Sequence, residues 1–277
     1  MRKTATRGTD LLGALRAAQA EGYTLFPLWR EILADCETPV SAYRKLARTP
    51  YTFLLESVEG GERLGRYSFV GIAPERVLRV RGDRAEWRFL AGPRAGEREV
   101  VACDDPLALI EAELSRDRVA PVAGPGTPGA ALPRFAGGAV GYLGYETVAH
   151  FERIPLPERD ALGLPDAVQI FTDTLLIFDH VTHRARLLTH ARLAGDLAAT
   201  LADAQARLDG IARDLAETPL THTAFAITES AETPEPVADA DRQRYMAGVA
   251  QAKEAIVAGD AFQIVLSRRT QRPTTAD

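Results

Sequence analysis

Four apolar segments of strand length follow one another early in the chain, at residues 52–56, 67–72, 77–81 and 85–89. The last two flank Gly82-Asp83, and a glycine–aspartate pair between apolar segments is a signal for a tight hairpin. Because such short turns join only antiparallel strands, this part of the chain predicts an antiparallel sheet.

Helical segments are expected on both sides of these strands. Thr38 and Pro39 are suited to open a helix, and Asp105 with Pro106 is suited to cap another that runs to about residue 116. Further helices are expected at 193–216 and 241–258, and a strand at 169–178 that returns at 184–188. The sequence therefore predicts an α+β fold, in which mostly antiparallel strands form a barrel or sandwich with helices packed outside.

The chain is expected to divide into four parts. Residues 1–20 are a tail or short helix, 21–216 the main domain, 217–238 a linker rich in Thr, Pro and Glu, and 239–277 the start of a second, α/β domain. The last part contains AFQIVLS at 261–267, which is typical of a strand buried on both faces. Such a strand needs neighbours and a covering layer, so we expect the second domain to be truncated in this sequence.

Charge and composition exclude several classes of partner. The net charge of −5 and the dispersed Lys and Arg residues argue against nucleic acid. No apolar run is long enough to cross a bilayer, so no membrane association is expected. Cys36 and Cys103 lie far apart and form no CxxC motif, which favours two reduced core thiols and a cytoplasmic location.

Two motifs that suggest chemistry have simpler interpretations. The glycine-rich segment 137–144 does not have GxGxxG spacing and no GK[ST] follows it, so close backbone packing is favoured over a phosphate loop. His180 and His183 sit at a predicted turn with no third ligand nearby, so a solvated turn is favoured over a metal site. We expect no metal site in this chain.

The segment Leu54-Leu55-Glu56-Ser57 has the chemistry to bind a zwitterionic amino acid. A carboxylate can pair with the ligand's ammonium, a hydroxyl can bond its carboxylate, and the apolar strand can hold its side chain. The alternative is that Glu56 is simply exposed at a strand end and that Ser57 forms a turn. The residue types alone leave both interpretations open.

Five separated stretches, in order, resemble component I of anthranilate synthase. They are GYTLFPLWREILADCETPVSAYRKL (22–46), FLLESVEGGERLGRYSFVGIAP (53–74), FAGGAVGYLGYETVAHFE (135–152), DAVQIFTDTLLIFDH (166–180) and YMAGVAQAKEAIVAGDAFQIVLSRR (245–269). Together they cover roughly the first half of a typical member of that family.

The resemblance implies a lyase of tryptophan biosynthesis that converts chorismate and ammonia to anthranilate and pyruvate with Mg²⁺. A glutamine amidotransferase subunit, component II, would supply the ammonia. The family's feedback site for L-tryptophan is built around the LLES motif, so Glu56 and Ser57 would meet the polar groups of tryptophan and Leu55 its ring. Arg66 would line the same pocket. The motifs for Mg²⁺, chorismate and acid–base chemistry would lie beyond Asp277, so the resemblance implies no complete catalytic site and no activity for residues 1–277 alone.

Gln263 would line the active site, because relatives that add water to chorismate resemble this strand but carry a lysine at this position as general base. An amide cannot take up a proton near pH 7, which argues against isochorismate and salicylate synthases. It does not separate anthranilate synthase from aminodeoxychorismate synthase component I of the folate pathway. A stand-alone amino-acid-binding regulatory module, without catalysis, is the other alternative.

Overall fold

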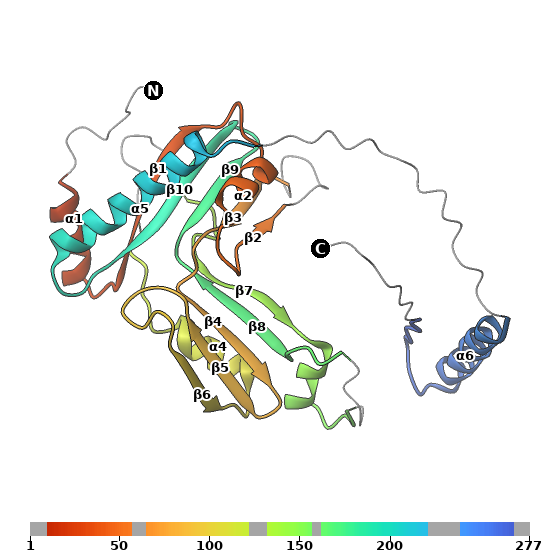
Figure 1. Cartoon of the computed structure of the whole chain (residues 1–277). Coiled ribbons are helices and arrows are strands. Elements are labelled where there is room, and N and C mark those ends of the chain that lie inside the picture. Colours follow the sequence, from red (N-terminus) through yellow and green to blue (C-terminus); the bar gives the residue numbers. More distant parts are fainter. Residues whose placement is uncertain (1–9, 57–64, 122–131, 157–161, 221–238, 269–277) are drawn as a thin grey trace. The chain divides into compact units, whose positions relative to one another are not determined.

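The computed structural model describes residues 10–56, 65–121, 132–156, 162–220 and 239–268. Two compact units are present, Met1–Thr221 and His222–Asp277, and each is described by itself. The first unit is built on two five-stranded sheets in which all neighbouring strands are antiparallel (Figure 1). The expected α+β fold with antiparallel sheets is confirmed.

Sheet A has the strand order β1-β10-β9-β3-β2. Its strands are β1 (Leu25–Leu33), β10 (Arg184–Arg192), β9 (Leu175–Asp179), β3 (Tyr67–Gly71) and β2 (Phe53–Leu55). Sheet B has the order β6-β5-β4-β8-β7. Its strands are β6 (Arg98–Ala102), β5 (Arg84–Phe89), β4 (Arg76–Arg81), β8 (Ala167–Thr172) and β7 (Gly138–Leu143).

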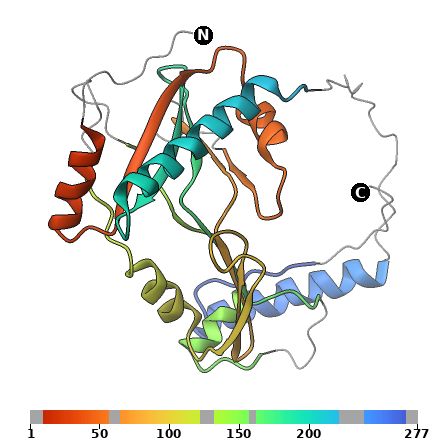
Figure 2. The same ribbon diagram turned by 60° about the vertical axis from the view of Figure 1, so that its left-hand side comes forward.

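Three helices cover one face of sheet A: α1 (Leu11–Ala20), α2 (Pro39–Leu46) and α5 (Leu197–Glu217). Figure 2 shows α5 lying along the sheet. The buried core between them includes Leu15, Leu176, Leu187 and Leu208. Leu175, Ile177 and Leu188 point to the opposite face, where they meet aromatic side chains, because neighbouring residues of a strand face opposite ways.

The helix starts follow the capping chemistry that the sequence indicates. Thr38 and Ser41 form a reciprocal capping box with Pro39 in the first turn of α2. Asp105 accepts hydrogen bonds from the N–H groups of Leu107 and Ala108 at the start of α4 (Pro106–Leu114). Helix α4 packs against sheet B, and a 3-10 helix, η1 (Tyr145–His150), follows β7.

The expectation of one strand over residues 169–178 is wrong. The chain leaves sheet B at the end of β8 and enters sheet A at the start of β9, with Asp173 and Thr174 between them. A second crossing, from β3 to β4, lies beside it, and the Ile72 N–H donates to the Thr174 carbonyl at 3.1 Å. An apolar run carries no signal for the point where a strand changes sheets. Strands β1 and β6 were also not predicted.

The second unit contains helix α6 (Asp239–Ala258), which ends at Gly259 with a left-handed φ of 85°. The buried strand expected at 261–267 is not formed, and Phe262 and Gln263 are exposed. A strand needs a partner for its N–H and C=O groups, and the described part of this unit contains no other strand. Among the residues described in both units, no helix is long and apolar enough to cross a membrane.

Candidate functional site

The end of β2 carries the predicted amino-acid-binding residues. Strand β2 is the edge of sheet A, Leu55 is 42% exposed, and Glu56 follows it as an exposed side chain. Ser57 lies outside the described residues. Leu55 pairs with Phe69 of β3 and shares its sheet face with Phe53, because side chains alternate along a strand. The predicted ligand residues that the structure describes thus border the aromatic face of sheet A.

That face is half-buried and rich in rings. Phe53, Tyr67, Phe69 and Phe135 pack over the buried Ile177 and its apolar neighbours. Phe69 and Phe135 meet edge to face, with ring centroids 5.3 Å apart. Aromatic rings in this arrangement favour a further ring. The alternation in Phe53-Leu54-Leu55 and in the sequence of β3 is the signal that places these side chains together.

Arg66 is held by Asp179 at the end of β9. Its Nε and Nη2 atoms donate to the two carboxylate oxygens at 3.1 and 2.8 Å, and its guanidinium lies 4.9 Å from the Tyr67 ring centre. Asp179 is only 3% exposed and also accepts the Val181 N–H. Burial by itself would raise the pKa of Asp179, but the hydrogen bonds from Arg66 and the backbone hold it below its ordinary value. Arg66 therefore ties β3 to β9.

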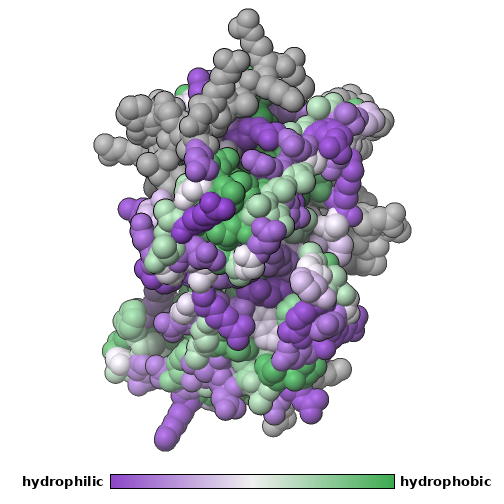
Figure 3. Space-filling model, turned by 90° about the vertical axis from the view of Figure 1, so that its left-hand side faces the viewer, coloured by the Kyte–Doolittle hydropathy of each residue, from purple (hydrophilic) through white to green (hydrophobic). Residues whose placement is uncertain are grey.

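A second feature is a cavity of about 390 Å³ between the two sheets. It is lined by Leu25, Glu75, Arg76, Glu113, Leu114, Asp117, Val119, Arg134, Ala136, Gly137, Gly138, Phe171, Thr172, Asp173, His190 and Arg192. Hydrophilic side chains gather in a recess across the middle of the space-filling view (Figure 3). Leu55, Glu56 and Arg66 do not line this cavity.

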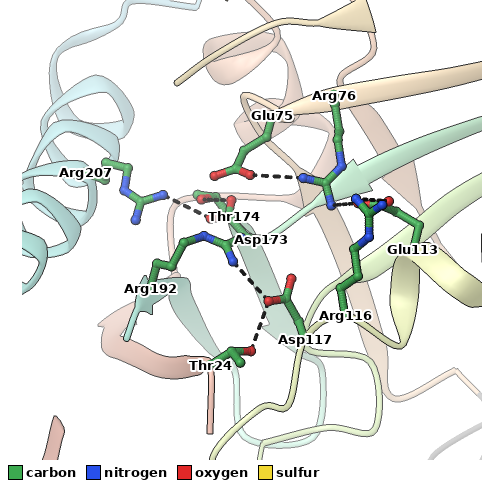
Figure 4. Close-up of polar contacts among 10 residues, drawn as sticks. All are labelled: Thr24, Glu75, Arg76, Glu113, Arg116, Asp117, Asp173, Thr174, Arg192 and Arg207. Carbon is green, nitrogen blue, oxygen red and sulfur yellow. Dashed lines mark hydrogen bonds and ion pairs between the residues drawn. The ribbon is translucent and has the colours of Figure 1, made fainter. Parts of the chain in front are cut away.

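Ion pairs cross the walls of the cavity, as Figure 4 shows. Glu113 of α4 accepts Arg76 at 2.5 Å and Arg116 at 2.7 Å. Arg192 of β10 donates to Asp117 at 3.0 Å, and the Thr24 hydroxyl donates to the same oxygen. Strands of both sheets, a helix and two connecting segments therefore meet around one space.

Asp173, at the crossing from β8 to β9, is the centre of a second group. Its carboxylate accepts Arg207 of α5 at 3.1 Å and the Thr174 hydroxyl at 2.9 Å. Its carbonyl lies 3.0 Å from Nδ1 of His190, and burial lowers the pKa of His190, so the neutral ring donates its Nδ1–H there. These contacts fix the crossing against β10 and α5.

Glu75 lies at the other crossing, one residue before β4. Its carboxylate lies 3.8 Å from Nη1 of Arg76, and the charges of Arg192 and Arg207 also act on it. Burial raises the pKa of Glu75, and the neighbouring charge of Asp173 raises it further. Close to Glu75, Ala73 adopts a left-handed φ of 45°, which is uncommon for a residue with a side chain. The crossing is therefore strained, and the one ion pair of its carboxylate within the described residues is the long contact with Arg76.

Glycines allow the close approach of β7 to its surroundings. A Cβ at Gly141 would lie 1.8 Å from the Val168 carbonyl oxygen of β8. Gly137 has a φ of 137°, and a Cβ there would lie 3.1 Å from the His190 ring. The glycine-rich segment thus serves close packing of strand on strand, in agreement with the interpretation favoured from its spacing.

Several expectations concern residues elsewhere. Cys103 is buried as expected, whereas Cys36 is exposed, so the expectation that both are core residues is wrong for Cys36. Gln263 is exposed in the second unit. Within the described part of the chain, no group of three His, Cys, Asp or Glu side chains is placed to hold a metal ion.

Comparison with known proteins shows which family this chain belongs to. Residues 103–277 match the family described as chorismate binding enzyme. The chain belongs to the chorismate binding enzyme family. It is 38% identical over 254 residues to anthranilate synthase component 1 of Pseudomonas aeruginosa, covering 90% of this chain and 49% of that protein. The Streptomyces coelicolor protein of the same name is 36% identical over 279 residues, covering 98% and 48%.

The chain therefore spans about half the length of the curated relatives it matches. The crystal structure of anthranilate synthase component I from Streptococcus pneumoniae aligns with a TM-score of 0.44 at 18% identity, covering 83% of this chain and 46% of that one. The resemblance drawn from the five sequence stretches is confirmed by the family match and the named relatives.

Proposed function

We propose that this chain carries the amino-terminal, regulatory half of anthranilate synthase component I, with the start of the chorismate-binding half attached. The whole enzyme converts chorismate and ammonia to anthranilate and pyruvate, and L-tryptophan inhibits it by binding at Leu55, Glu56 and Ser57. The supporting observation is the aromatic face of sheet A, which ends at Leu55 beside an exposed carboxylate. The names of the relatives point the same way.

The binding free energy of tryptophan requires both the apolar face and the charged groups of this site. Burying an indole side chain removes about 150–250 Å² from water and contributes about 4–6 kcal/mol. Micromolar affinity needs about 8 kcal/mol after the costs of association. Charge-assisted hydrogen bonds must supply the rest. Glu56 is exposed and its carboxylate can receive the ammonium, and Ser57 follows it in the sequence with a hydroxyl for the carboxylate.

The proposal also covers the partner subunit, the metal ion and the cellular location of the whole enzyme. A glutamine amidotransferase subunit supplies ammonia, and the setting is cytoplasmic. Mg²⁺ belongs to the complete active site, and the carboxylates described here do not fit that role because no three of the described metal-type ligands converge. Gln263 lines the chorismate site, where an amide leaves water unactivated and favours ammonia. The 277 residues alone are expected to form no anthranilate, as measured by its fluorescence with chorismate, Mg²⁺ and ammonium.

The test is inhibition by L-tryptophan in the full-length enzyme that contains this chain. We expect Glu56→Ala and Ser57→Phe each to raise the half-inhibitory tryptophan concentration at least about tenfold, because each removes a polar contact worth about 1.5 kcal/mol or more. Glu111→Ala, an exposed carboxylate on α4, is the matched control and should leave inhibition unchanged. Unaltered inhibition in both site variants would refute the assignment.

A second experiment separates anthranilate synthase from aminodeoxychorismate synthase. The full-length gene is expressed in a tryptophan auxotroph and in a folate-pathway auxotroph, each lacking its own chorismate enzyme. Growth of the first strain alone supports the proposal. Growth of the second alone assigns the enzyme to the folate pathway, and growth of neither favours a regulatory module without catalysis.

A further inference from the structure

The cavity between the sheets is not explained by the proposed function. Its walls come from both sheets, α4 and the segments before β7, and its volume of about 390 Å³ is within the range of small-molecule sites. The ligand residues at the end of β2 lie outside it. The inference below therefore does not rest on the proposed function.

Most charges around the cavity already have partners. Arg76 and Arg116 bind Glu113, Arg192 binds Asp117, and Arg207 binds Asp173. These ion pairs account for most of the charge on the walls, although the buried Nε atoms of Arg76 and Arg207 have no hydrogen-bond partner among the described residues. The chemistry of the site depends on the charged side chains that remain.

Two opposite charges remain. Arg134 is exposed and forms no ion pair or hydrogen bond within the described part of the chain. Glu75 has only the 3.8 Å approach to Arg76, and it faces the same group of side chains as Asp173 in Figure 4. The charge of Asp173 raises the pKa of Glu75, while the charges of Arg192, Arg76 and Arg207 lower it, so Glu75 lies among three guanidinium groups without a close ion pair to any of them.

Apolar side chains complete the lining. Leu25, Leu114, Val119 and Phe171 contribute to the walls between these charged groups. A site with an under-paired carboxylate, a free guanidinium and an apolar wall is complementary to a molecule that carries both charges and a hydrocarbon part.

We propose that the cavity is a second ligand site, which binds a small molecule carrying both an ammonium and a carboxylate group. The ammonium lies at Glu75 and Asp173, the carboxylate at Arg134, and the hydrocarbon part against Phe171 and Leu114. The site is built where the two chain crossings meet, so its occupant contacts both sheets.

Calorimetric titration of the 277-residue chain tests this. The probes are L-phenylalanine and 6-aminohexanoate, which differ in the separation of their charges, at up to about 10 mM, where a Kd of about 1 mM gives near saturation. At least one probe is expected to bind saturably. Removing its ammonium by N-acetylation, or its carboxylate by conversion to the amide, is expected to weaken binding at least about tenfold. Failure of both probes to bind, or equal binding of the derivatives, would overturn the proposal.

Variants locate the bound probe. Glu75→Gln and Arg134→Gln should each weaken binding at least about tenfold, whereas the exposed Glu111→Gln should leave it within about twofold. Arg134 is exposed and Glu75→Gln removes a half-buried charge, so both variants are expected to fold, and thermal melting without probe checks this. Glu56→Ala removes the carboxylate at the end of β2 and therefore reports any binding of the probe at that second place. If Glu56→Ala abolishes binding while the cavity variants do not, the probe occupies the end of β2 and the proposal is wrong.

Discussion

Replacing Arg66 by Gln removes the ion pair that ties β3 to β9. Arg66 gives two hydrogen bonds to Asp179, at 3.1 and 2.8 Å, while Asp179 is 3% exposed. In the variant this buried carboxylate keeps the N–H groups of Val181 and Thr182 but loses its cation. The main cost of the substitution is therefore an uncompensated buried charge rather than a lost surface contact.

The expected loss is about 2 kcal/mol. Breaking a fully buried ion pair costs about 3–5 kcal/mol, and the value is lower here because the Arg66 side chain is 41% exposed and solvent partly screens the pair. For a unit of this size, about 2 kcal/mol corresponds to a fall in Tm of about 4–8 °C. Thermal and urea denaturation at pH 7, followed by circular dichroism, measure it.

The pH dependence follows from the lowered pKa of Asp179. A carboxyl with a lowered folded-state pKa stabilises the protein above its unfolded value of about 3.9, and that stabilisation is lost as the pH falls through the folded value. In Arg66→Gln the buried carboxyl can accept a proton at higher pH, which relieves its cost. The difference in stability between wild type and variant should therefore be full at pH 7 and smaller at pH 4.

Two controls make this result decisive. Arg30→Gln removes an exposed ion pair with Asp209, whose side chains are 40% and 58% exposed, and should cost less than about 1 kcal/mol. Adding Asp179→Asn to Arg66→Gln removes the unpaired charge and should recover part of the loss. Equal losses for Arg66→Gln and Arg30→Gln, or the same difference at pH 4 and pH 7, would refute the argument.

Two further predictions concern the strands around the cavity. Gly141→Ala should destabilise the protein by more than about 3 kcal/mol in thermal denaturation, because its Cβ would lie 1.8 Å from the Val168 carbonyl oxygen. The control Gly210→Ala, in α5 with nothing within 4 Å, should stabilise by about 0.5–1 kcal/mol, and similar effects of both would contradict this. Glu75→Gln should raise Tm at pH 7, since a carboxyl with a raised folded-state pKa loses stability as pH rises through that value. This gain should vanish below about pH 4, under the unfolded value of about 4.3, and an equal gain there would contradict it.

The parts of the fold that sequence reveals are those fixed by neighbouring residues. Asp105 with Pro106 predicts the start of α4, and Gly82-Asp83 predicts the hairpin of β4 and β5, because both depend on local backbone chemistry. The segment 261–267 shows the opposite case. Its apolar composition indicates a buried strand, but a strand forms only where another offers its N–H and C=O groups. An apolar composition therefore indicates that a segment can form a strand, and the presence of a neighbouring strand decides whether it does.

The candidate sites differ in the same way. Leu55 and Glu56 were predicted because their chemistry is contiguous in the sequence and resembles a family motif. The cavity has no such signal, since Glu75, Arg134 and His190 come from segments far apart in the chain. Arg66 was assigned to the ligand site through the family resemblance, and its pairing with Asp179, 113 residues away, became visible only in the folded sheet.

The two crossings explain why the carboxylates of the cavity come together. Residues 72–75 carry the chain from sheet A to sheet B, and Asp173 with Thr174 carries it back. The hydrogen bond from Ile72 to Thr174 holds the two crossings side by side, which brings Glu75 close to Asp173 despite their repulsion. A change in the angle between the sheets must bend these same peptide units. A ligand charge that offsets the repulsion would therefore favour the arrangement seen here, and it would do so at the crossings that join sheet A, with the end of β2, to sheet B.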